Sequence, residues 1–251
     1  MPLGARADLP PAAEIHGEPI AWTAARVPAH AVLAGATVRL EPVNPHRHGK
    51  DLFAAARDGR DPQLWDYMSV GPFADEQAFA AWLATTVTST DPLFFTVVDA
   101  RTERASGMAS YLRITPANGV IEIGNIWFGP DLQRTRQATE AIFLLARHVF
   151  DDLGYRRLEW KCNALNRRSR QAAERFGFSY EGIFRQHMVV KGRNRDTAWF
   201  AMLDRDWPLI RAAFEAWLAP ENVDSDGRQR RSLRTIRAAI AQGTSGLPSR
   251  P

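Results

Sequence analysis

Residues 120–154 read VIEIGNIWFGPDLQRTRQATEAIFLLARHVFDDLG and decide the fold of this chain. The first nine residues predict a strand, because β-branched and aromatic residues dominate them and Pro130 ends the run. A helix is predicted next, since apolar residues recur at steps of four and three: Ala138, Ile142, Leu145, Val149 and Leu153. Residues 157–162 then alternate between charged and apolar side chains, as a strand does. A strand, a helical crossover and a second strand predict two adjacent strands that run parallel.

The flanking sequence adds strands and helices on both sides of this unit. Upstream we expect a strand at 38–43, helices at 45–58 and from 75 onward, and a hairpin of strands 94–98 and 108–114. Downstream we expect a helix at 166–176, stopped by Gly177, and a hairpin of strands 184–191 and 197–203. This order predicts an α/β fold with a mixed, mostly antiparallel sheet of six to seven strands and helices on both faces.

The chain divides into three segments by composition. Residues 1–35 are rich in Ala and Pro without periodicity and are interpreted as an N-terminal extension. Residues 36–206 hold the predicted sheet and form the central domain. Residues 207–251 hold one aromatic helix and a basic tail, whose arginines could contact RNA or an acidic partner, although a solvated tail is favoured.

Composition limits the class of protein. The single cysteine, Cys162, cannot form an internal disulfide, and it alternates onto the apolar side of a strand, which predicts a buried thiol. The longest strongly apolar run, 141–146, is too short to span a membrane, and the N-terminus lacks a secretory signal. We therefore expect a cytoplasmic protein without membrane partners. The six histidines show no metal-binding spacing, so no metal is expected. The net charge of +4 suits a nucleic acid or a phosphorylated cofactor.

Three stretches, in this order and on these elements, resemble the GCN5-related N-acetyltransferase (GNAT) superfamily, in its RimJ/RimL-like branch. They are residues 121–128, residues 133–141, and residues 166–182 with Asn166-Arg167-Arg168-Ser169 at their start. The resemblance covers roughly residues 36–206. It implies acetyl-CoA as cosubstrate, bound where strands 120–128 and 157–162 splay apart, so that the pantetheine arm pairs with exposed backbone groups near Trp127 and Phe128.

The resemblance also implies a pyrophosphate site at the turn between strand 120–128 and the next helix. Backbone N–H groups at a helix start, aided by the helix dipole, bind phosphate there. The family pattern has a glycine where this chain has Arg136, and either Arg136 or Arg134 could pair with a phosphate through its side chain. The predicted cofactor-binding residues of this turn are Gln133, Arg134, Thr135, Arg136, Gln137, Ala138 and Thr139.

Two further residues follow from the third stretch. The family's matching asparagine contacts pantetheine, and Asn166 also suits a helix N-cap. The resemblance places the hydroxyl of Ser169 near the thioester sulfur, where it could donate to the leaving thiolate. Many relatives carry a tyrosine as general acid on this helix, and this chain has Ala173 at that position.

The acceptor amine must lose a proton before it can attack, so a base is required. Glu122 is the first candidate, because it is a charged residue in an apolar strand, and its alternative is an ion pair to Arg113 or a neighbouring arginine. His187, in the hairpin that usually walls the acceptor site, is the second. A strand amide near Trp127 or Phe128 could stabilise the oxyanion.

The sequence therefore predicts an acetyl-CoA-dependent N-acetyltransferase that acts on a primary amine of a peptide or a small molecule, as a monomer or homodimer. Nucleic acid is disfavoured as a partner. The alternative is a catalytically degenerate member that binds coenzyme A or a protein or RNA partner, since the glycine and the tyrosine of the family are missing.

Overall fold

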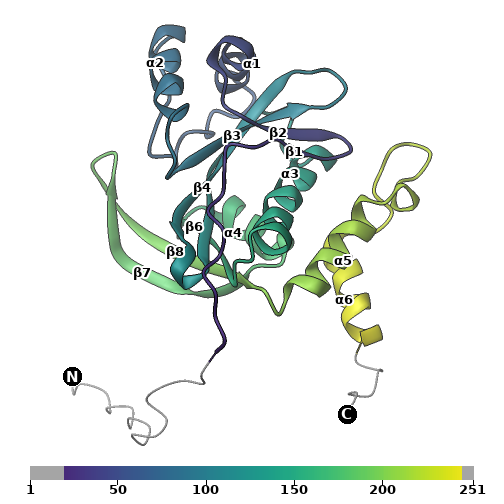
Figure 1. The fold of residues 1–251 in the computed structure, drawn as a ribbon. Helices are drawn as coiled ribbons and strands as arrows, with labels where there is room; N and C mark the ends of the chain where they lie inside the picture. Colours follow the sequence, from purple (N-terminus) through teal and green to yellow (C-terminus); the bar gives the residue numbers. More distant parts are fainter. Residues whose placement is uncertain (1–19, 245–251) are drawn as a thin grey trace, which may run out of the picture.

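The computed structural model describes residues 20–244 of the 251-residue chain. Residues 1–19 of the expected extension and 245–251 of the expected basic tail lie outside this part. Eight strands form one sheet in the order β1-β2-β3-β4-β5-β6-β8-β7, in which β5 and β6 are the parallel pair (Figure 1). The predicted fold class is confirmed, with one short strand more than expected.

The first half of the sheet is antiparallel. It consists of β1 (Leu33–Ala34), β2 (Val38–Pro42), β3 (Leu93–Asp99), β4 (Ala105–Thr115) and β5 (Val120–Phe128), each paired with the one before it. Helices α1 (Pro45–Ala56) and α2 (Glu76–Thr86) interrupt the run between β2 and β3. The side chains of Asn44 and Asp75 cap these two helices, as their sequence positions suggest.

The second half carries the crossover. Helix α3 (Arg136–Arg147) and the π-helical turn η3 (His148–Asp152) lead to β6 (Arg157–Asn163), and α4 (Arg167–Phe176) leads to the hairpin β7 (Ser179–Val190) and β8 (Arg193–Leu203). All of strand β6 pairs with β8, whose residues Thr197 to Leu203 form that pairing, and β7 is the edge. Short 3-10 turns lie at η2 (Pro116–Asn118) and η4 (Pro220–Asn222).

The sheet buries both faces. Along β3, Phe95 and Val97 pack into the larger core beneath α3, whereas the alternate residue Val98 packs into a second core beneath α1 and α2. That second core is rich in aromatic rings, and Trp127 lies in it, 5.3 Å from the ring of Trp65. The two faces are therefore covered by different helices, as Figure 1 shows.

The C-terminal helices belong to the larger core. Phe214 of α5 (Trp207–Leu218) stacks on Phe143 and Phe176. Leu233 and Ile236 of α6 (Leu233–Thr244) are also buried, so the solvated tail favoured by the sequence is wrong for this helix. The basic composition of the tail could not show that α5 offers a partner surface.

Helix α3 is anchored at its start to two distant segments. The buried carboxylate of Glu140 accepts from the backbone N–H of Ala36 and Thr37 in the β1–β2 turn. Gly35 is required there, since a Cβ atom would lie 2.7 Å from that carboxylate. At the first helical position, Arg136 donates to the carbonyl of Leu218 at the end of α5.

No helix within residues 20–244 is long and apolar enough to cross a membrane. The same residues hold no group of three or more His, Cys, Asp or Glu side chains arranged to bind a metal ion.

Candidate functional site

Strands β5 and β6 separate after three residue pairs. Val120, Ile121 and Glu122 pair with Arg157, Leu158 and Glu159. Beyond this point β5 continues to Phe128 and β6 to Asn163 with no pairing between them in the described part of the chain. Asn125, which has a φ of +49°, marks an irregularity in β5. Main-chain groups on the facing edges of the two strands are therefore left for another partner.

The turn between β5 and α3 leaves further N–H groups free. Thr135 caps the helix by accepting from the N–H of Ala138. Within residues 20–244, no acceptor lies within hydrogen-bond distance of the N–H groups of Arg134, Arg136 and Gln137. Arg134 adopts a φ of +61°, the left-handed region that favours glycine. A helix start with free N–H groups beside separated strands fits a nucleotide pyrophosphate and its pantetheine arm.

The side chains of this turn are mostly committed to the protein itself. Gln133 donates to the carbonyl of Phe128 and to the carboxylate of Asp61, both at 2.9 Å. The guanidinium of Arg136 reaches Leu218, and the hydroxyl of Thr139 accepts from Arg175. Arg134 is exposed, and it is the arginine of this turn that has no such contact in the described residues. Phosphate binding here would thus depend on the backbone and on Arg134.

Asn166 and Ser169 both face the end of β6. Asn166 accepts from the N–H of Ser169 and so caps α4, as expected. The hydroxyl of Ser169 accepts from the indole of Trp160 at 3.0 Å. Burial raises the pKa of the neighbouring Cys162 thiol, and this cysteine is buried as predicted. A hydrogen bond from Ser169 to this thiol opposes the effect of burial, so the Ser169 hydroxyl contacts both Trp160 and Cys162.

A loop from residue 57 to 74 crosses this region. The carboxylate of Asp61 accepts from Gln133 on the β5–α3 turn and from Arg168 on α4, 3.0 Å away. Tyr67 lies further along the loop and donates to the carbonyl of Leu165. Trp65 instead packs in the aromatic core. The loop thus joins the two sides of the gap between β5 and β6.

The face of β6 opposite to Trp160 and Cys162 carries a cluster of charges that we call the charged face. It comprises Arg113, Glu122, Arg157, Glu159, Lys161, Glu181 and Arg195. Lys161 is almost fully buried and bridges Glu122 at 3.1 Å and Glu159 at 2.6 Å. Its ammonium also lies 3.7 Å from the ring centre of Trp199, which is the residue of β8 paired with Lys161. Sequence alternation placed Glu159 and Lys161 on the polar side of the strand but did not identify Lys161 or Arg195 as site residues.

The ion pair expected as the alternative for Glu122 is present. Its carboxylate accepts from Arg113 at 2.6 Å as well as from Lys161. Burial raises the pKa of Glu122, while the two cations oppose that shift. Glu122 is therefore held by side chains from two other strands, β4 and β6, at the point where β5 and β6 separate.

His187 reaches the same region from the β7–β8 hairpin. Its Nδ1 lies 3.0 Å from the hydroxyl of Thr197, and its ring lies 5.8 Å from that of Trp199. Its pKa is lowered, by partial burial first and then by the positive charges of Arg113, Arg195 and Lys161. The imidazole is therefore neutral at pH 7 and able to accept a proton.

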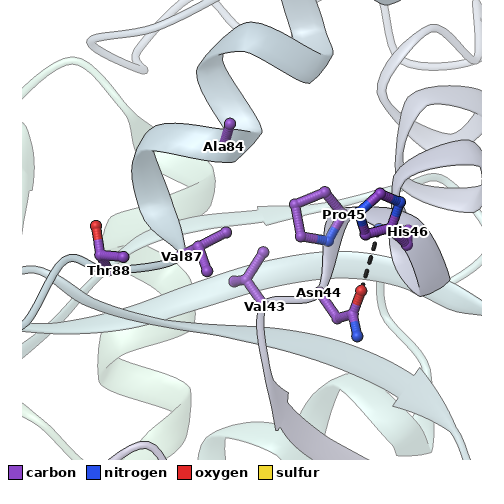
Figure 2. A pocket seen from close by; sticks show the side chains of 7 residues that line it. All are labelled: Val43, Asn44, Pro45, His46, Ala84, Val87 and Thr88. Carbon is purple, nitrogen blue, oxygen red and sulfur yellow. Dashed lines mark hydrogen bonds between the residues drawn. The ribbon is translucent and has the colours of Figure 1, made fainter.

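Two surface hollows lie on the described part of the molecule. One lies beside Asn125 of β5, between Met68, Trp82 and Phe94. The other, drawn in Figure 2, lies between the start of α1 and the end of α2, where Val43, Ala84 and Val87 give it an apolar lining. None of the predicted site residues lines this second hollow, so it is separate from the gap between β5 and β6.

The known proteins to which this chain is similar are GNAT acetyltransferases. The sequence model of the family described as "Acetyltransferase (GNAT) domain" matches residues 37–179. A GNAT crystal structure from Brucella melitensis is 51% identical with a TM-score of 0.85, and the match covers 87% of this chain and 99% of that one. A GNAT-family structure from Chromobacterium violaceum is 42% identical with a TM-score of 0.70, over 83% and 99%.

A curated relative from Bacillus subtilis carries the provisional name ribosomal N-acetyltransferase YdaF. It is 30% identical over 101 residues, which are 40% of this chain and 55% of the relative, so the match spans about half of that protein. The chain belongs to the GNAT acetyltransferase family.

Proposed function

We propose that this protein transfers the acetyl group of acetyl-CoA to a primary amine. The observation that supports this most directly is the separation of β5 and β6 after Glu122 and Glu159, next to a helix start with unpaired N–H groups. Acetyl-CoA, when bound, supplies an acetyl thioester. The chain supplies backbone donors at both the strands and the turn, to which a nucleotide with a linear arm is complementary.

The reaction needs one proton acceptor and one group that stabilises the departing sulfur. The amine nitrogen forms a bond to the acetyl carbon, the carbon–sulfur bond breaks, and one proton leaves the nitrogen while the thiolate gains one. We propose His187 as the acceptor of the amine proton, because it is neutral and open to solvent. Glu122 is the competing candidate, because it lies at the point where the strands separate, although two ion pairs engage its carboxylate.

Ser169 is proposed to donate to the thiolate. Its oxygen accepts from Trp160 and its hydroxyl also hydrogen-bonds to Cys162, so donation to the thiolate would replace the bond to Cys162. The carbonyl oxygen of the tetrahedral intermediate also needs a donor. We propose a main-chain N–H near Trp127 or Phe128, in the part of β5 that does not pair with β6. The side chain of Trp127 is itself buried in the aromatic core.

A thiol-release assay with acetyl-CoA and a panel of amines tests this function. Release of coenzyme A that depends on an amine supports the proposal. Tight binding of coenzyme A without release on any amine would instead support a degenerate binding protein. The acceptor panel should include peptides with free N-termini, free amino acids and diamines.

A further inference from the structure

One guanidinium of the charged face has no counter-ion. The face holds four cations and three carboxylates in the described residues. Arg113 and Lys161 share Glu122, Lys161 also contacts Glu159, and Arg157 contacts Glu159 and Glu181. No carboxylate among residues 20–244 lies within salt-bridge distance of Arg195. The cluster therefore carries one positive charge that the protein does not neutralise.

Arg195 is also partly removed from water. Its Nε–H is buried with no acceptor in the described part of the chain, and so is the indole N–H of Trp199, four residues later on β8. Burying donors without partners is costly, and native proteins rarely do so away from a site where another molecule provides the acceptor. Because residues an even number apart on a strand share a face, both donors belong to the face that carries Lys161 and His187.

The surroundings of Arg195 suit the rest of a small acceptor. The rings of Phe184 and Trp199 lie 4.4 Å apart and form an apolar wall on the hairpin that carries Arg195. His187 stands on the same wall, 5.6 Å from Phe184. An anion held by Arg195 would thus be separated by a short apolar stretch from the proposed proton acceptor.

We propose that the acceptor is a primary amine that also carries a carboxylate, and that Arg195, with the indole N–H of Trp199, binds this carboxylate while the amine faces His187. This inference rests on the proposed function. A planar guanidinium matches a carboxylate through two parallel hydrogen bonds. Diamines and other polycationic acceptors are disfavoured, because their second ammonium would face Arg113, Lys161 and Arg195.

The direct test compares three amines of equal length: 4-aminobutyrate, 4-aminobutanamide and 1,4-diaminobutane. We expect kcat/KM, corrected for the unprotonated amine, to be at least about tenfold higher for the carboxylate than for the amide, and lowest for the diamine. Equal rates, or a faster diamine, would overturn the proposal. Further free amino acids vary the distance between amine and carboxylate.

Two peptides show whether the carboxylate belongs to a peptide or to a small molecule. Ser-Asp-Ala-amide and Ser-Asn-Ala-amide differ by one carboxylate at the second residue. A preference for the first assigns an acidic peptide N-terminus, whereas turnover of free amino acids alone assigns a small molecule. A preference for Ser-Asn-Ala-amide over the acidic peptide, with no turnover of free amino acids, would refute the proposal.

Substitution of Arg195 identifies the residue. Arg195→Gln should raise KM for the carboxylate substrate about tenfold and leave kcat/KM for the neutral amide within about twofold. Arg195→Glu should reverse the order and favour the diamine. Arg193→Gln is the matched control, because Arg193 is exposed two residues away on the same strand. An unchanged substrate order in Arg195→Glu, with an unchanged melting temperature, would exclude Arg195.

A direct binding measurement separates this inference from the proposed function. Calorimetric titration of the three amines into the protein saturated with coenzyme A does not need turnover. Preferential binding of the carboxylate without any acetyl transfer would refute the proposed function and keep the anion site. Equal weak binding of all three amines together with normal acetyl transfer would refute the anion site alone.

Discussion

The β5–α3 turn and the charged face use the chain in opposite ways. At the turn, most side chains are bound within the protein, and backbone N–H groups of Arg134, Arg136 and Gln137 are left free. On the charged face, β6 pairs with β8 along the whole of β6, and it is a side chain, Arg195, that lacks a partner. A backbone site tolerates substitution of its side chains, whereas a side-chain site does not. This difference explains how the family's turn glycine can be Arg136 here without loss of the N–H groups.

The largest expected effect is on the charged face. Lys161→Met should lower the free energy of unfolding by about 3–5 kcal/mol, because it leaves Glu122 and Glu159 buried without their shared cation. Urea denaturation measures this. Lys50→Met is the control, since Lys50 is exposed and forms no salt bridge in the described residues, and it should change stability by less than about 0.5 kcal/mol. A small effect of Lys161→Met would show that the cluster is not held by this ammonium.

The next effect is on the pH dependence of the reaction. Because the pKa of His187 is lowered, the imidazole stays neutral to a pH below about 6.5, the usual pKa of histidine. Once corrected for protonation of the amine, kcat/KM should therefore be constant near pH 7 and fall only on the acid side of pH 6.5. His187→Gln should lower kcat about 10²-fold or more and remove this acid limb.

Glu122→Gln distinguishes the two candidate bases in the same experiment. If His187 accepts the proton, the acid limb persists in Glu122→Gln and the rate falls by a similar factor at every pH. A limb that persists in His187→Gln and disappears in Glu122→Gln would assign the base to Glu122.

A pair of substitutions at one residue tests whether the turn acts through its backbone. Arg136→Pro removes the N–H at the first position of α3, where proline is well tolerated, and should weaken coenzyme A binding about tenfold or more. Arg136→Ala keeps the N–H and removes the contact with Leu218, so the affinity should change little. Calorimetry measures both. Equal losses in the two variants would show that the side chain matters rather than the backbone.

The smallest effect is expected at the junction of the two regions. Ser169→Ala removes the acceptor of the Trp160 indole and should cost about 1 kcal/mol of stability. It should also slow acetyl transfer while coenzyme A binding stays nearly unchanged. Ser225→Ala is the control, since Ser225 is exposed and its hydroxyl forms no hydrogen bond in the described residues. Unchanged transfer by Ser169→Ala would remove Ser169 from the reaction.

The sequence predicts the elements well because periodicity reports local structure. The crossover helix, the caps at Asn44 and Asp75, and the alternation in β6 all appear as expected. The extent of β7 does not, since this strand begins at Ser179 rather than Phe184 on an exposed edge where alternation is weak. The parting of β5 and β6 is a matter of pairing between distant segments, and it came from the family resemblance rather than from residue pattern.

The candidate site is less predictable than the fold. Glu122 was identifiable because a charge in an apolar strand is unusual, and His187 because of its place in the hairpin. Arg195 was not, because its significance lies in the partner that it lacks, which only the arrangement of four strands reveals. Likewise the contact between Arg136 and Leu218 joins residues 82 positions apart.

The clamps on the first turns of α3 have a consequence for how ligand occupancy could be detected. Glu140 ties this helix to the turn that follows β1, and Arg136 ties it to the end of α5. A nucleotide that rigidifies the helix start would therefore slow amide exchange near Thr37 and near Leu218, in segments that lie toward opposite ends of the polypeptide.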